Sequence, residues 1–137
     1  MTVIADTGPL YALVDRSDTW HDRVRGWWGK QPRQVVVPVT VLPEVSYLLQ
    51  TRIGPPAEQA FVEAVADGEF TMEPLESGDI VRAVELMREY ADLPLGFVDA
   101  TVVATAERLG IREILTTDRR HFGVIRPQHT GAFVLRP

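Results

Sequence analysis

Four acidic residues lie where a carboxylate is costly unless it has a function. Asp6 directly follows the run Thr-Val-Ile-Ala, and Asp118 follows Ile-Leu-Thr-Thr. Glu44 and Asp99 stand among the apolar residues of two helical patterns. If a fold gathers them, four carboxylates form a negative pocket of oxygen ligands, which suits a hard divalent cation such as Mg²⁺ or Mn²⁺. The chemistry that follows most directly is metal-assisted cleavage of a phosphodiester.

Each acid also has a purely structural interpretation. Asp6 and Asp99 could cap the helices that begin beside them, and Asp118 could be a turn residue. Glu44 is harder to explain in this way, because an acid among Val, Leu and Tyr is rarely buried without a partner. The joint occurrence of the four acids favours a shared metal site.

Three polar residues close to the acids are further candidates. Thr7 and Thr117 could hydrogen-bond a carboxylate or a metal-bound water, or they could serve only as capping or strand residues. Asp92 precedes Leu-Pro in a polar stretch, where a loop residue without a function is the favoured interpretation.

Basic residues directly follow Asp118. Arg119 and Arg120 are candidate contacts for a phosphate backbone, and Arg112 is a third. His121 could meet a substrate phosphate or be a solvated surface residue. We do not expect it to act as a general base.

Short β-rich runs alternate with longer helical patterns, which predicts an α/β fold with a mostly parallel sheet covered on both faces. The predicted strands span residues 2–5, 34–37, 70–73, 113–116 and 132–135. The predicted helices span residues 9–14, 19–28, 41–52, 56–66, 78–90 and 98–109. Ligands of such sheets bind beyond the carboxyl ends of the strands, where the strand order reverses. Asp6 and Asp118 follow strands there, and the apolar helix stripes direct Glu44 and Asp99 to the same rim.

The composition fits one domain spanning residues 1–137, with 45% apolar residues and no cysteine. We expect a soluble, cytoplasmic protein, since no signal peptide is recognisable and no apolar run approaches the ~18 residues of a membrane helix. A net charge of −5 argues against nucleic-acid binding. That argument is weak here, because the four acids account for most of the excess and bound cations would cancel it.

The four acids lie in segments that together are quite specific. They are Ile-Ala-Asp-Thr-Gly-Pro-Leu at Asp6, the isolated Glu44 in a Val/Leu helix, Leu-Gly-Phe-Val-Asp-Ala at Asp99, and Thr-Thr-Asp-Arg-Arg-His-Phe at Asp118. In this order they resemble the PIN-domain ribonucleases, most of all the VapC-type toxins of bacterial toxin–antitoxin pairs. The resemblance implies a three-layer α/β/α sandwich around a five-stranded, mostly parallel sheet of order 3-2-1-4-5.

The resemblance also implies an activity, a cofactor and partners. Asp6 and Asp99 would bind Mg²⁺ or Mn²⁺ directly, Asp118 would complete that site or hold a second ion, and Glu44 would bind directly or through water. A metal-bound water would then attack RNA, whether tRNA, rRNA or mRNA. The implied partners are a protein antitoxin, whose tail occupies the acidic groove, and a second copy of the chain in a homodimer.

The first motif departs from the family pattern in one place. It reads Asp-Thr-Gly where many members have Asp-Thr-Ser or Asp-Ser-Ser, so one hydroxyl group near the site is lost. Two alternative functions stay open from the sequence: a housekeeping PIN nuclease of RNA processing, and a non-catalytic module whose acidic groove binds an arginine-bearing peptide.

Overall fold

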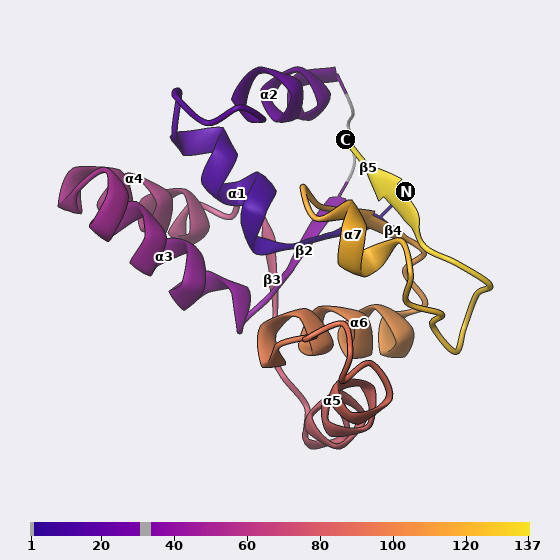
Figure 1. Cartoon of the computed structure of the whole chain (residues 1–137). Coiled ribbons are helices and arrows are strands. Elements are labelled where there is room, and N and C mark those ends of the chain that lie inside the picture. Colours follow the sequence, from indigo (N-terminus) through magenta and orange to yellow (C-terminus); the bar gives the residue numbers. More distant parts are fainter. Residues whose placement is uncertain (1, 31–33) are drawn as a thin grey trace.

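The computed structural model describes residues 2–30 and 34–137, which fold around one five-stranded sheet (Figure 1). Its order is β3-β2-β1-β4-β5, and every pairing is parallel, as expected from the sequence. The strands are β1 Thr2–Ala5, β2 Gln34–Pro38, β3 Thr71–Glu73, β4 Glu113–Leu115 and β5 Val134–Arg136. The order reverses between β1 and β4, so the switch point of the sheet lies at its centre.

Helices cover both faces of this sheet. In Figure 1, α1 to α4 lie on one side of the strands, and α5 and α6 pack together on the other. The helices are α1 Thr7–Val14, α2 His21–Lys30, α3 Val41–Arg52, α4 Pro55–Ala66, α5 Ser77–Glu89, α6 Phe97–Leu109 and α7 Arg119–Phe122. The three-layer α/β/α arrangement is therefore confirmed for the described residues.

The boundaries of several elements differ from those expected. Helix α1 begins at Thr7 rather than at residue 9, because Pro9 lies in the first turn, where its missing N–H costs no intrahelical bond. Strand β5 runs from Val134 to Arg136 and so lies one to two residues later than expected. The short helix α7 was not expected, since four residues are too few to give a periodic pattern.

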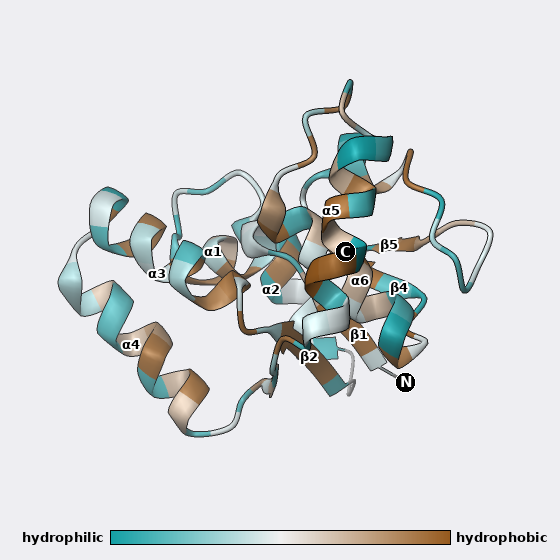
Figure 2. Cartoon of the chain, turned by 90° about the horizontal axis from the view of Figure 1, so that it is seen from below, coloured by the Kyte–Doolittle hydropathy of each residue, from teal (hydrophilic) through white to brown (hydrophobic). Residues whose placement is uncertain are grey.

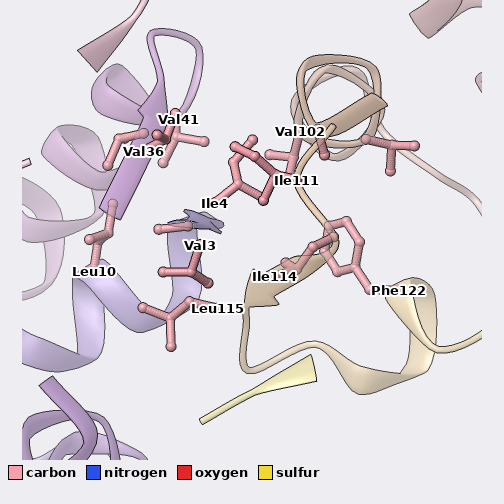
Figure 3. Close-up of a cluster of buried hydrophobic side chains, with 14 of the residues drawn as sticks. Val3, Ile4, Leu10, Val36, Val41, Val102, Ile111, Ile114, Leu115 and Phe122 are labelled. Atoms are coloured by element: carbon pink, nitrogen blue, oxygen red, sulfur yellow. The ribbon is translucent and has the colours of Figure 1, made fainter. Parts of the chain in front are cut away.

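The central strands are buried on both faces, which explains their continuous apolar sequence. Neighbouring residues of β1 point to opposite sides: Val3 lies near Leu10 and Leu115, whereas Ile4 lies between Val36 and the α6 side (Figure 3). Val3 and Ile4 are both fully buried. The strands β1 and β2 are accordingly hydrophobic in Figure 2, while the outer helices alternate between hydrophobic and hydrophilic residues.

Parallel pairing gives the sheet two chemically different edges. The amino ends of the strands carry Thr2, Gln34, Thr71 and Arg112, which together line a cavity of about 520 Å³. The carboxyl ends of β1 and β4 lead into the segments with Asp6 and Asp118. Within the described residues, no helix combines the length and apolar character needed to cross a bilayer.

Candidate active site

The carboxyl edge of the sheet brings the acid-bearing segments together. Asp6 immediately follows β1 and precedes α1, and Asp118 lies between β4 and α7. Glu44 and Asp99 each lie in the first turn of a helix, α3 and α6 respectively. Asp6 and Asp118 are far apart in the sequence, and their segments meet because β1 and β4 are neighbours in the sheet.

Asp6 is the most buried of the four acids, with 5% of its surface exposed. Burial raises the pKa of its carboxyl from 3.8 to about 7, and the neighbouring charges of Asp99 and, more weakly, Asp118 act in the same direction. Hydrogen bonds from the Thr7 backbone N–H and the Thr116 hydroxyl partly oppose this rise. A carboxyl in such surroundings favours a proton or a bound cation.

Asp99 connects the remaining acids to this centre. Burial is the main reason why its pKa is raised, and the charges of Asp118 and Glu44 raise it further. His121 and the backbone N–H of Gly96 act in the opposite direction. Asp99 is therefore the acid that links Glu44 electrostatically to the pair of Asp6 and Asp118.

Thr116 links two of the acids by hydrogen bonds and was not among the candidates from the sequence. Its hydroxyl donates to Asp6 Oδ2 over 3.2 Å and accepts from the Asp118 backbone N–H over 2.8 Å. The side chain is completely buried. A hydroxyl residue between a buried apolar strand and an acid was the available signal, because a buried hydroxyl needs a partner.

Thr116→Val is expected to lower the free energy of unfolding by about 1–3 kcal/mol, because it leaves the Asp118 N–H unpaired and removes a donor to Asp6. Urea denaturation measures this loss. Thr105→Val is the matched control, since Thr105 is 1% exposed and its hydroxyl makes no hydrogen bond within the described chain. The control should lose nothing, and equal losses in the two variants would contradict the linking role of Thr116.

His121 lies beside two of the acids, with 22% of its side chain exposed. Its Nδ1 is hydrogen-bonded to the carboxylate of Asp118, whose other oxygen accepts from the His121 backbone N–H over 3.0 Å. The hydrogen bond to Asp118 raises the pKa of the imidazole, which the charges of Asp118 and Asp99 also raise. His121 thus places a potential positive charge beside two of the acids.

The other candidates are distributed differently. Thr7 is buried, and its hydroxyl has no hydrogen-bond partner in the described part of the chain. Arg119 and Arg120 are exposed on α7, where Arg119 donates to the carbonyl of Pro137 over 2.8 Å. Asp92 is exposed in the loop between α5 and α6, with no hydrogen bond or ion pair to another described residue.

Arg112 does not belong to this site. It lies before β4, at the amino edge of the sheet, whereas the acids lie at the carboxyl edge. The structure therefore does not bring this candidate for a phosphate contact together with the four acids. Residues that directly precede a parallel strand face away from the functional edge.

The donor set at the carboxyl edge fits a hard divalent cation. Carboxylate and hydroxyl oxygens are the ligand types such ions prefer. The pKa of Asp6 is raised to about 7 mainly by burial and further by the neighbouring acids, and a bound cation would offset both effects. Across residues 2–30 and 34–137, no three Asp, Glu or His side chains converge closely enough to ligate one ion directly. An ion here would be held partly through water, as Mg²⁺ commonly is.

Comparison with known proteins agrees with this geometry. The PIN domain model matches residues 3–126. Ribonuclease VapC26 of Mycobacterium tuberculosis is 34% identical over 135 residues, which cover 98% of this chain and 100% of that protein. The chain therefore belongs to the PIN-domain family, the class that its fold and acid-lined edge define. Within that family it is a homologue of the VapC ribonuclease toxins, which confirms the resemblance inferred from the sequence.

Solved structures share the fold at lower identity. The crystal structure of Mycobacterium tuberculosis VapC20, described as a toxin that cleaves the sarcin–ricin loop, matches with a TM-score of 0.86 and 24% identity over 98% of this chain and 99% of that one. A toxin–antitoxin complex from Klebsiella pneumoniae matches with a TM-score of 0.69 and 23% identity over 96% of this chain and 99% of that one.

Proposed function

We propose that the chain is a Mg²⁺-dependent endoribonuclease, with Mn²⁺ as a substitute, whose single domain spans residues 1–137. The observation that carries this proposal is the buried carboxyl of Asp6, which is coupled to Asp99 and Asp118. Asp99 is in turn coupled to Glu44. Asp6 and Asp99 are the proposed direct ligands, Asp118 completes the ion site, and Glu44 acts directly or through water.

The protein's own groups have distinct tasks in this proposal. A bound divalent ion supplies a more acidic water and stabilises charge on the phosphate. Thr116 holds Asp6 and Asp118 in fixed relation through its two hydrogen bonds. His121 restrains the Asp118 carboxylate, and burial of Asp6 excludes bulk water from one side of the site.

The proposal is tested by incubating purified protein with total tRNA and rRNA in the presence of Mg²⁺ or Mn²⁺. Discrete cuts that disappear with EDTA are the expected result. Intact RNA from folded, metal-loaded protein that carries no bound partner would overturn the proposal. That result would favour the non-catalytic alternative, in which the acidic edge binds an arginine-bearing peptide.

Arg120→Ala is expected to raise the KM for RNA, since one phosphate contact is lost. The slope of the logarithm of the binding constant against the logarithm of the salt concentration should become shallower by about one. Arg120 is exposed beside the acid cluster and has no hydrogen bond or ion pair to another described residue, so its guanidinium is available to RNA. Arg112→Ala is the matched control at the opposite edge of the sheet. Filter binding at several salt concentrations measures both variants, and equal effects would contradict this assignment.

We also infer a protein antitoxin as partner, because the structural neighbours include toxin–antitoxin complexes. A negatively charged carboxyl edge suits a partner segment that carries arginine. A homodimer and a cytoplasmic location complete the proposal. Size-exclusion chromatography with light scattering tests the homodimer without reference to activity.

A further inference from the structure

Gly8 and Thr117 lie unusually close together, one in each of the two segments that carry Asp6 and Asp118. A β carbon built on Gly8 would lie 2.1 Å from Thr117 Oγ1, 3.3 Å from its Cβ and 3.6 Å from its Cγ2. The backbone of Gly8 is not in the left-handed region, unlike that of Gly54, Gly68 and Gly110. While Thr117 keeps this rotamer, glycine is therefore required at position 8 for space rather than for backbone conformation.

The contact fixes the orientation of the threonine side chain. The three staggered rotamers of Thr117 direct its hydroxyl, its methyl group or its Hβ toward residue 8. Any side chain at position 8 excludes the first two, because a heavy atom would lie far inside van der Waals contact. Only glycine at position 8 allows the hydroxyl to occupy the place that it has in this structure.

That hydroxyl belongs to the residue directly before Asp118, and it lies against the start of α1, which follows directly after Asp6. Thr117 stands between Thr116 and Asp118, which are hydrogen-bonded to each other. The Thr117 side chain is only partly exposed, and it makes no hydrogen bond to another residue in the described ranges. On the other side of the contact, the Thr7 hydroxyl is buried and also has no partner there. Two unused hydroxyl groups thus flank Gly8 at the edge of the acid cluster.

We infer that Gly8 and Thr117 act as one unit. Because the glycine has no side chain, it leaves room for the Thr117 hydroxyl beside the acid cluster. There the hydroxyl would hydrogen-bond the water shell of an ion held by Asp6, Asp99 and Asp118. Thr117 is thus a positioning residue, and the hydroxyl missing from the Asp-Thr-Gly motif is supplied from the other acid-bearing segment. This inference rests on the metal site of the proposed function.

A double-mutant cycle on Mn²⁺ binding tests the unit without RNA. Thr117→Ala and Gly8→Ala should each raise the Mn²⁺ concentration at half-saturation by about 10-fold, the lower end of effects seen for groups around metal ligands. The double variant should lose no more than Thr117→Ala alone, since both changes remove the same hydroxyl from the same place. Thr117→Ser should restore binding to within about 2-fold, because it keeps the hydroxyl group.

Gly78→Ala is the matched control for the glycine substitution. Gly78 is the second residue of α5, as Gly8 is of α1, and a β carbon there would meet nothing within 4 Å. It should bind Mn²⁺ like the wild type. Thermal melting of each metal-free variant adds a second readout: Gly8→Ala should melt lower than the wild type, and Thr117→Ala in the same chain should recover most of that loss.

The possible results separate this inference from the proposed function. Mn²⁺ affinity at the wild-type level in Thr117→Ala, or losses that multiply in the double variant, would overturn the unit whatever the RNA assay gives. A wild type that binds Mn²⁺ but cuts no RNA would overturn the nuclease proposal. The double-mutant cycle on Mn²⁺ binding would still test whether Gly8 and Thr117 act as one unit. A wild type that binds no Mn²⁺ would overturn both.

Discussion

Asp99→Asn is expected to abolish metal-dependent RNA cleavage, with a loss of at least ~100-fold in kcat/KM. Changes around metal ligands cost about 10–100-fold, and loss of a direct ligand should cost more. Asp99 is also coupled to Asp6, Asp118 and Glu44, so the change removes charge from the centre of the cluster. Cleavage of the RNA identified in the first assay, followed over time with saturating Mg²⁺, measures the loss.

Asp92→Asn is the matched control for this change. It removes the same charge from an exposed loop residue that makes no hydrogen bond or ion pair within the described chain. We expect its cleavage rate to equal that of the wild type. Full activity in Asp99→Asn, or an equal loss in both variants, would show that the effect does not arise from the acid cluster.

Metal-free Asp6→Asn is expected to be more stable than the wild type above about pH 7. In the unfolded chain this carboxyl titrates near 3.8, whereas in the folded protein burial and the neighbouring acids raise its pKa to about 7. Between these values the folded protein holds a proton that the unfolded chain has lost. The wild type's free energy of unfolding therefore falls as pH rises through this range, by about 4 kcal/mol at most, and stays at the lower value above it.

Asparagine carries no charge, so Asp6→Asn should lack this decline. Urea denaturation with EDTA at about pH 4, pH 6 and pH 8 gives the two pH profiles. Saturating Mn²⁺ should then raise the melting temperature of the wild type more than that of Asp6→Asn, because the ion stabilises only the folded state that binds it. Parallel pH profiles together with equal Mn²⁺ shifts would be inconsistent with a buried, ion-binding carboxyl at position 6.

The fold was largely predictable because the central strands have a simple physical signature. Strands β1 and β4 are buried on both faces, and each ends at a polar segment that marks the carboxyl edge. That combination predicts that Asp6 and Asp118 lie at one rim of the sheet. The short α7 could not be predicted in this way, since its formation depends on the Asp118 side chain accepting from the His121 N–H.

The structural interpretations of Asp6 and Asp99 as caps, and of Asp118 as a turn residue, were only partly correct. Asp6 occupies the N-cap position of α1, yet its side chain makes no capping hydrogen bond. Asp99 accepts from the Gly96 N–H, and Asp118 does cap α7, so these two serve local structure and lie in the cluster as well. A local role and a role in the cluster are therefore compatible, which is why sequence alone left the choice open.

The remaining site features depend on contacts between distant segments. Thr116 meets Asp6 across 110 positions of sequence, and Gly8 meets Thr117 across a similar distance. Periodicity describes one segment at a time, so it carries no information about which hydroxyl faces which acid. The location of Arg112 was different, because its place before a predicted strand already indicated the amino edge.

The pairing of β1 with β4 also determines when the acid cluster can form during synthesis. Asp6 precedes β4 and Asp118 by more than one hundred residues, so it leaves the ribosome well before they are made. A nascent chain that ends before β4 lacks one of the two neighbours of β1 and one of the four acids. The acid cluster therefore assembles only once β4 and Asp118 have been synthesised, and chains released before that point carry only part of it.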